Sequence, residues 1–408
     1  MPNENLLAIT PIDGRYKSKT KNLSNYFSEF ALIKTRVEVE INWLILISKN
    51  KSLNFIPELS SSQQKKVLNI FREFSIQDAK QVKNIEKKTN HDVKAVELFI
   101  VEKLKKIKLN KFCEFVHFCC TSEDINNLSY SLMLQRFLSQ EFSPAIDALQ
   151  KKLHVMAKKW AKISMLAFTH GQPASPTTLG KEFSNFSYRL KFHSDLIKSI
   201  KQNGKFNGAS GNYNAHLIAN HKTDWEILSK KFVNSLGLNF SSHSTQIELK
   251  DAMAYQLTNT HNLNNVLIDF AQDIWLLISK NYLKQNLKAG EVGSSTMPHK
   301  VNPIDFENAE GNFGISNSLS NFFAHKLTKS RLQRDLSDST VLRNIGLSFG
   351  YSYLAISSLI NGMSKVEPNK DFTINELNDN WEVLAEAVQT IMRYEGISDA
   401  YEQLKQLS

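Results

Sequence analysis

Residues 263–278 read LNNVLIDFAQDIWLLI, and this stretch decides the fold class. An apolar residue recurs in it at every third or fourth position, which is the period of one face of an α-helix. Asp269 and Asp273 interrupt the stretch, so it is too polar to cross a bilayer as an apolar helix of about 20 residues. We therefore predict a long helix that is buried along one face, and no interaction with a membrane. The apolar stripe consists of Leu263, Val266, Leu267, Phe270, Ile274 and Leu277.

Around this helix, the chain is poor in the residues that most often interrupt helices. Its 408 residues include 15 Gly and 9 Pro, and no glycine lies between Gly14 and Gly171. Turn-dense β folds, and nucleotide-binding folds built on glycine-rich loops, need more of these residues. The sequence thus predicts an all-α fold around a central bundle of long helices. Further long helical segments are expected at 25–48, 128–160, 180–202, 304–330 and 340–363.

Two breaks divide this helical pattern. The first lies near residues 109–113, ahead of a new helix start, and the second lies near Pro368, which stops the preceding helix. We therefore predict three domains. They are an N-terminal helical domain over 1–112, a central long-helix bundle over 113–365 and a C-terminal helical domain over 366–408.

Composition narrows the choice of partners. The formal net charge is +10, but the lysines occur mainly as scattered pairs without interleaved aromatic residues. We predict no nucleic-acid partner, and local positive potential serves an anionic small molecule equally well. The N-terminus lacks a basic segment followed by an apolar run, so a cytoplasmic protein is expected.

Cofactor and metal chemistry find no support in the sequence. It has no phosphate-binding P-loop, no G-x-G-x-x-G motif and no acidic cluster suited to a metal. Cys113, Cys119 and Cys120 show neither zinc-site spacing nor a disulfide framework, and reduced thiols are expected. We therefore predict no cofactor and no metal.

The few glycines and prolines are concentrated, and one such cluster lies between two predicted helices. Residues 293–302 read GSSTMPHKVN, which combines small residues, neighbouring hydroxyls and the cation of Lys300. Asn302 is expected to cap the next helix, with Pro303 as its first residue. Such a segment is more than a connector requires, so it is a candidate reaction loop.

A second cluster, THGQPASP at 169–176, places His170 on a segment that we expect to be irregular and stiffened by proline. An imidazole with an ordinary pKa near 6.5 exchanges protons at neutral pH. TNHD at 89–92 and TSED at 121–124 resemble helix N-termini, whose free N–H groups favour anions. DGRY at 13–16 adds a cation and a phenol on a turn. Together these motifs predict a substrate with several negative charges and a proton-transfer pair of hydroxyl and imidazole.

These segments resemble the motifs of a known group of enzymes. The 293–302 loop and the 169–176 segment are similar to the signature loop and the T-H-x-Q-x-A-x-P segment of the fumarase/aspartase superfamily. Within it, the segments at 13–16, 89–93, 121–124 and 338–343 resemble those of the bacterial-type adenylosuccinate lyase family. The resemblance extends from about residue 7 to the last residue.

The resemblance implies elimination of fumarate from adenylosuccinate to leave AMP. It also implies the same cleavage of the succinylated aminoimidazole carboxamide ribotide (SAICAR) to AICAR in purine synthesis. By motif match, Ser294 is the base, His170 is the acid and Glu307 orients the catalytic histidine, while His91 competes for the acid role. The implied substrate-binding residues are Arg15, Tyr16, Asn90, His91, Asp92, Thr121, Ser122, Gln246, Ser295, Lys300, Val301, Asn302, Asn308, Arg334, Ser339, Thr340 and Arg343.

The resemblance further implies a homotetramer whose active sites are shared between subunits. Family members continue past Ser408, so the chain is expected to end partway through its C-terminal helical domain. Two other readings stay open. One is another fumarate-releasing lyase of the superfamily, such as argininosuccinate lyase, or a cycloisomerase, and the other is an inactive helical scaffold.

Overall fold

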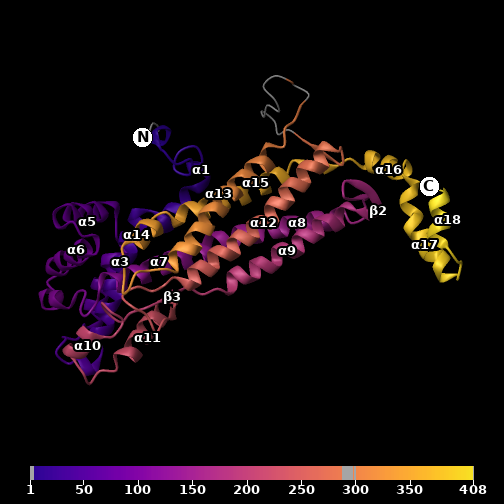
Figure 1. The fold of residues 1–408 in the computed structure, drawn as a ribbon. Coiled ribbons are helices and arrows are strands. Elements are labelled where there is room, and N and C mark those ends of the chain that lie inside the picture. The colour runs from indigo at the N-terminus through magenta and orange to yellow at the C-terminus, as the bar shows by residue number, and fades with distance from the viewer. Residues whose placement is uncertain (1–3, 287–296, 298–299, 408) are drawn as a thin grey trace. The chain divides into compact units, whose positions relative to one another are not determined.

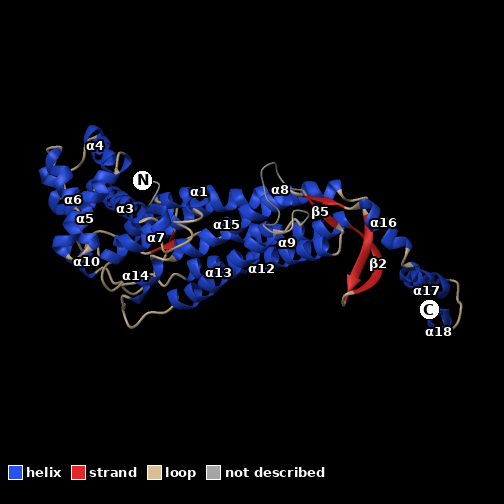
Figure 2. Ribbon diagram, turned by 90° about the horizontal axis from the view of Figure 1, so that it is seen from above, coloured by secondary structure: helices blue, strands red, loops and turns tan. Residues whose placement is uncertain are grey.

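The computed structural model describes residues 4–286, 297 and 300–407. The chain forms two compact units: unit 1 comprises residues 1–144, 195–261 and 315–354, and unit 2 comprises 145–194, 262–314 and 355–408. Helices dominate both units (Figures 1 and 2), which confirms the predicted all-α class. Five long helices contribute residues to both units: α8 (Ser143–Lys159), α9 (Leu179–Ser199), α12 (Asp251–Ser279), α13 (Ile304–Leu327) and α15 (Ile345–Met363).

In unit 2, segments of these five helices form a ring in which a polar contact joins each neighbouring pair. The apolar stripe of α12 is buried as predicted, except that Leu277 is half-buried. Phe270 of this stripe packs edge-on against Phe183 and Phe186 of α9, with ring centroids 5.6 and 5.2 Å apart. The helix contacts are Gln150–Ser187 (α8–α9), Arg189–Asp269 (α9–α12), Gln272–Glu310 (α12–α13), Asn308–Ser358 (α13–α15) and Lys152–Ile360 (α8–α15).

Unit 2 also contains a hairpin that the sequence did not predict. β1 (Ser164–Thr169) pairs antiparallel with β2 (Gln172–Thr178), so the segment expected to be irregular is a strand hairpin. His170 and Gly171 form its turn, with φ angles of 54° and 77°. The rest of unit 2 comprises the antiparallel pair β5 (Leu283–Gln285) and β6 (Val366–Pro368), α16 (Lys370–Asn378), η6 (Trp381–Leu384), α17 (Ala385–Tyr394) and α18 (Ala400–Leu407).

Unit 1 is built around α3 (Glu29–Ser48), which contacts α6 (Asp92–Lys106) and α7 (Ser122–Phe137). Trp43 of α3 is fully buried, with its ring centroid 4.4 Å from that of Phe206, and its indole N–H donates to the Phe118 carbonyl. Such an aromatic centre contributes several kcal/mol through burial alone.

The remaining elements of unit 1 are short or lie at its edges. They are η1 (Glu4–Leu7), α1 (Lys17–Thr20), η2 (Lys21–Leu23), α2 (Ser24–Phe27), η3 (Lys51–Leu53), α4 (Ser61–Arg72), α5 (Ile76–Thr89), η4 (Asn110–Phe115), the π-helical turn η5 (Leu138–Phe142), the parallel pair β3 (Asn203–Gly204) and β4 (Asn239–Phe240), α10 (Asn214–Ala219), α11 (Trp225–Ser235) and α14 (Ser337–Leu342). No helix within the described residues combines the length and the apolar character needed to cross a membrane.

Candidate active site

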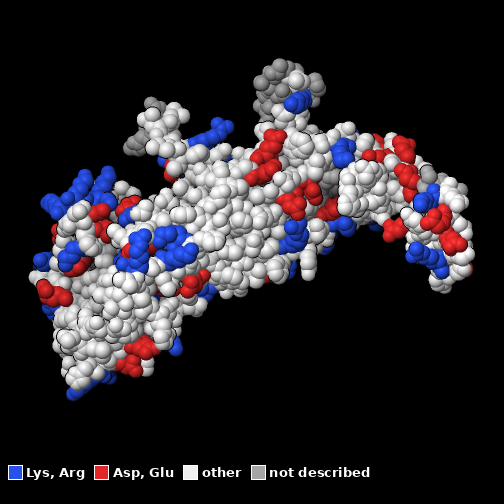
Figure 3. Space-filling model, in the orientation of Figure 1, with Lys and Arg blue, Asp and Glu red and all other residues white. Residues whose placement is uncertain are grey.

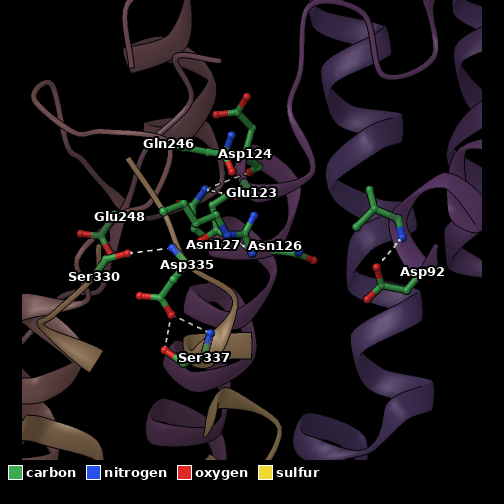
Figure 4. A network of polar contacts seen from close by, with 12 residues as sticks. Asp92, Glu123, Asp124, Asn126, Asn127, Gln246, Glu248, Ser330, Asp335 and Ser337 are labelled. Carbon is green, nitrogen blue, oxygen red and sulfur yellow. Dashed lines mark hydrogen bonds and ion pairs between the residues drawn. The ribbon is translucent and has the colours of Figure 1, made fainter. Parts of the chain in front are cut away.

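The first turn of α7 is the centre of the candidate site in unit 1. Its predicted binding residues Thr121 and Ser122 are half-buried, and the next two residues, Glu123 and Asp124, are buried acids. The Asp124 carboxylate accepts a hydrogen bond from the N–H of Thr121, which caps the helix, at 2.8 Å. Figure 4 shows both acids on this turn, close to Gln246. The predicted helix N-terminus is therefore confirmed.

Asp124 also fixes a neighbouring loop. Its carboxylate lies 2.8 Å from the Lys205 ammonium, and both side chains are fully buried. It accepts further hydrogen bonds from the backbone N–H groups of Asn207 and Gly208, at 3.1 and 3.2 Å. A buried carboxylate with this many donors is held in one orientation. Asp124 thus holds the 205–208 loop against the start of α7.

Two more predicted binding residues reach the same turn. Arg334 places a guanidinium nitrogen 3.2 Å from a Glu123 oxygen. Gln246 donates to the carbonyl of Ala209, directly after the loop that Asp124 holds. The sequence-predicted Ser122, Gln246 and Arg334 are therefore brought together through Glu123 and Asp124.

The segment after Arg334 is ordered by a local turn. Ser337 donates to the Asp335 carboxylate through both its hydroxyl and its N–H, and the Asp335 N–H donates to the Ser330 hydroxyl at 3.2 Å (Figure 4). The hydrogen bonds from Ser337 lower the pKa of Asp335 to about 2. This turn precedes α14, where the predicted Ser339 is half-buried and Thr340 is exposed.

Asp92, Arg36 and Arg343 form a second cluster in unit 1. Asp92 Oδ2 lies 2.7 Å from Arg36 and 3.1 Å from Arg343, and Arg343 also pairs with Glu29 at 2.9 Å. Although burial opposes it, the two guanidinium groups lower the pKa of Asp92. Tyr130 lies beside them, and burial raises its pKa to about 12. The predicted Asp92 and Arg343 are thus direct partners.

The neighbours of Asp92 occupy the junction between α5 and α6. Asn90 is exposed and adopts a left-handed conformation, with φ of 50°, as it ends α5. His91 caps α6, because its Nδ1 accepts from the N–H of Lys94 at 3.1 Å. The predicted helix start at 89–92 is confirmed, and His91 is its capping residue.

A cavity of about 420 Å³ lies beside Arg343 in unit 1. Asp13, Lys17, Ser28 and Asn344 are among the residues that line it. The predicted Arg15 is exposed, and its guanidinium carbon lies 6.0 Å from the centroid of the half-buried Tyr16 ring. The DGRY turn therefore adjoins a cavity that is also lined by Arg343, a predicted binding residue.

His170, the predicted acid, occupies the tip of the β1–β2 hairpin in unit 2. Its side chain is exposed and forms no hydrogen bond with any residue that the structure describes. On β2, the hydroxyl of Ser175 donates to Glu386 of α17, which ties the hairpin to the C-terminal helices. The imidazole of His170 is thus exposed at the tip of a hairpin that is hydrogen-bonded to α17.

The rest of the predicted reaction groups lie around the start of α13. Lys300 is exposed, Asn302 is half-buried, and the carbonyl of Val301 accepts from Gln285 at 3.1 Å. The helix begins at Ile304, so the expectation that Pro303 is its first residue and Asn302 its cap is wrong by one residue; the Pro303 carbonyl instead accepts from the N–H of Phe306. Ser294 and Ser295 lie outside the described residues.

Glu307 and Asn308 lie in the first turns of α13. Glu307 accepts from the indole N–H of Trp275 at 3.2 Å, and Asn308 accepts from the Ser358 hydroxyl at 2.8 Å. No hydrogen bond or ion pair joins Glu307 to His170 within the described residues, so the orienting role of Glu307 stays a prediction. Across those residues, no group of three or more His, Cys, Asp or Glu side chains is arranged to hold a metal ion.

Sequence reasoning missed the residues that hold the binding groups in place. Glu123 and Asp124 were interpreted only as part of a helix-cap motif, and the Lys205 and Lys250 ammonium groups were among many scattered lysines. Arg36 had a usable signal, because a cation that alternates with apolar residues, as in ALIKTRVEVEINWLILI, is seldom buried without a partner.

Fold and sequence comparisons define the class of protein. Residues 14–314 match the family model described as "Lyase", and residues 330–408 match the one described as "Adenylosuccinate lyase C-terminal". The crystal structure of a fumarate lyase from Mesorhizobium sp. BNC1 is similar to this chain with a TM-score of 0.75 at 16% sequence identity, covering 95% of this chain and 85% of that one. The family models identify a lyase, and the solved structure shares its fold.

Relatives with higher sequence identity show which family of lyases the chain belongs to. The chain is 50% identical to adenylosuccinate lyase of Legionella pneumophila (strain Corby) over 99% of its length and 89% of that relative. It is 46% identical to adenylosuccinate lyase of Escherichia coli (strain K12) over 100% of its length and 90% of that relative. The chain belongs to the adenylosuccinate lyase family.

Proposed function

We propose that this protein cleaves adenylosuccinate to AMP and fumarate, and SAICAR to AICAR and fumarate. The observation that carries the proposal is the identity of 46–50% to adenylosuccinate lyases along 99–100% of the chain. The grouping of Arg334, Ser122 and Gln246 at one helix turn supports it, because such a cluster suits a substrate with a phosphate and two carboxylates.

The proposed reaction is a β-elimination with two proton transfers. Ser294, as its alkoxide, removes the proton from the carbon beside a carboxylate. The electron pair of that C–H bond forms the double bond of fumarate, the C–N bond breaks, and His170 protonates the departing nitrogen. A serine hydroxyl is a weak base, so loop N–H groups and Lys300 must stabilise its oxyanion.

Different residues are proposed to bind the two ends of the substrate. In the proposal, Arg15, Tyr16, Arg334, Ser339 and Arg343 hold the phosphate end of the substrate. Lys300 and Asn302 bind the succinyl carboxylates, and Glu307 orients the catalytic histidine. The remaining predicted contacts are Asn90, His91, Asp92, Thr121, Ser122, Gln246, Ser295, Val301, Asn308 and Thr340.

A cytoplasmic homotetramer with shared active sites is part of the proposal. Tyr188 and Phe192 of α9, and Trp275 and Leu276 of α12, are exposed apolar side chains on the long helices. Figure 3 shows that large parts of one face carry neither Lys, Arg, Asp nor Glu. Exposed apolar side chains such as these four favour burial between subunits. Sedimentation that gives a fully active monomer would contradict this assembly.

One assay tests the proposed activity against its alternatives. Purified protein is mixed with adenylosuccinate, SAICAR or argininosuccinate, and fumarate release is followed by ultraviolet absorbance. We expect turnover of the first two only, and a loss of about 10²–10⁴-fold in Ser294→Ala. Turnover of argininosuccinate alone would support the other superfamily lyase, and no turnover of any substrate would support the inactive scaffold.

A further inference from the structure

The proposed reaction does not use Glu123, although this residue lies at the centre of the site. Its side chain is 2% exposed, and its two carboxylate oxygens face two different cations. Oε1 lies 3.3 Å from the Lys250 ammonium, and Oε2 lies 3.2 Å from the Arg334 guanidinium. Burial raises the pKa of Glu123, whereas Lys250 and Arg334 favour its charged form. One carboxylate therefore bridges two cations.

Each partner belongs to a different predicted binding segment. Glu123 directly follows the predicted contact Ser122, and Arg334 is itself a predicted contact. Lys250 lies four residues after the predicted contact Gln246, in the segment 246–250. The Lys250 ammonium also donates to the Glu248 carbonyl at 2.8 Å, which fixes it to its own segment. Figure 4 shows Glu123, Gln246 and Glu248 gathered at the start of α7. A single side chain thus ties three segments together.

Arg334 depends on this contact for its orientation. Its side chain is 14% exposed, and Glu123 is its ion-pair partner. The buried Nε of Arg334 has no hydrogen-bond partner among the residues that the structure describes. A long flexible side chain held at one end of its guanidinium loses its preferred direction when that contact is removed.

We propose that Glu123 is a positioning residue, which holds Arg334 in the direction that receives the anionic phosphate end of the substrate. This inference rests on the proposed function of the site. It differs from the role of Asp124, whose carboxylate pairs with the fully buried Lys205 and with backbone N–H groups. Glu123 acts on a substrate-binding cation, and Asp124 acts on the 205–208 loop.

The test uses Glu123→Gln, which keeps the size of the side chain but removes its charge. The amide offers one oxygen and directs its NH2 group at the other cation. We expect KM for adenylosuccinate to rise about tenfold while kcat changes less than twofold, because binding is lost before the chemical step. In an Arg334→Gln background, the same change should add no further rise in KM.

Two more variants separate positioning from stability. Glu123→Asp keeps a negative charge at this position, but its side chain is one methylene shorter and cannot reach both cations. It should therefore raise KM without lowering kcat. Glu38→Gln is the matched control, because Glu38 of α3 pairs at 2.8 and 2.7 Å with Arg136 of α7, the helix that carries Glu123, outside the predicted site. It should lower the melting temperature and leave KM unchanged.

The outcomes distinguish this inference from the proposed function. An unchanged KM in both Glu123 variants, or effects that add to those of Arg334→Gln, would overturn the positioning role in an active enzyme. If the wild type releases no fumarate, the proposed function fails. Calorimetric titration with AMP then still tests Glu123, since weaker AMP binding by Glu123→Asp than by the wild type supports the role and equal binding overturns it.

Discussion

Several predicted site residues of unit 1 are paired with other charged groups, whereas several of those in unit 2 are exposed. In unit 1, the binding residues Arg334, Arg343 and Asp92 are already engaged in ion pairs with other residues of the unit. In unit 2, His170 is exposed at a hairpin tip, and Lys300 is exposed ahead of α13. Groups that bind a polyanion must be held with their charges close together, whereas a proton donor must remain free to meet its substrate.

This difference implies that binding and chemistry fail in different ways. Changes in unit 1 should loosen a network and reduce stability as well as affinity. Changes at the hairpin of unit 2 should reduce turnover and leave the fold intact. The following predictions test that separation.

The largest effect is expected at His170. Replacing it with glutamine removes the proposed acid, so kcat should fall by about 10²–10⁴-fold with no change in melting temperature. His154→Gln is the control, because His154 is another exposed histidine of unit 2 outside the predicted site. The pH–rate profile of His91→Gln should keep the limb that His170→Gln removes; the opposite result would assign the acid to His91.

In unit 1, Lys205→Met should cost the most stability. It leaves the fully buried Asp124 carboxylate without its cation, and breaking such a pair typically costs about 3–5 kcal/mol. Urea denaturation measures the loss. Lys94→Gln is the control, since its exposed pair with Glu97 should contribute less than about 1 kcal/mol. Equal midpoints for the two variants would mean that unit 1 is not held by its buried charges.

A pH-dependent effect is expected at His117 of unit 1. Burial disfavours its charged form, but the Glu40 carboxylate 2.6 Å away raises the pKa of His117 above its usual value of 6.5. The pair therefore contributes its full stability below pH 6.5 and loses it as the pH rises through the raised pKa. His117→Gln should lower the melting temperature most at acid pH, and a pH-independent difference would refute the charged pair.

The smallest effect is expected for alanine at Gly171, the second turn residue of the hairpin. Its φ of 77° strains any side chain by about 1–2 kcal/mol, although an added Cβ meets no atom within 4 Å. Gly211→Ala is the comparison in unit 1, because its Cβ would lie 2.1 Å from the Ser244 carbonyl oxygen. We expect Gly171→Ala to reduce kcat a few-fold and Gly211→Ala to unfold at lower temperature. A greater loss of stability in Gly171→Ala would reverse the comparison.

The sequence predicted the helices well and the hairpin not at all. The stripe of α12 follows helical periodicity over four turns, and burial of that face is what a helix of this pattern achieves. Pro173 and Pro176, by contrast, argued against strands. In a two-stranded hairpin both strands are edges, so the missing N–H groups of Pro173 and Pro176 leave the pairing with Phe168 and Leu166 possible.

In the candidate site, the binding residues were predicted, but the residues that hold them in place were not. The family resemblance predicted Arg334, Asp92 and Arg343 as binding residues, but not what holds them. Glu123 and Lys250 were absent from that prediction, since nothing in the sequence links an acid at the start of one helix to a lysine 127 residues later.

The sequence by itself determined the class of fold and the helix starts of α6 and α7, and it predicted the residues of the proposed chemistry. These depend on local periodicity, capping and short motifs, all of which act within a few residues of chain. The tertiary structure decided which charges neutralise one another. Arg343 meets Glu29 across 314 residues, and ion pairs of this kind form only when packing brings the segments into contact and removes water from between them.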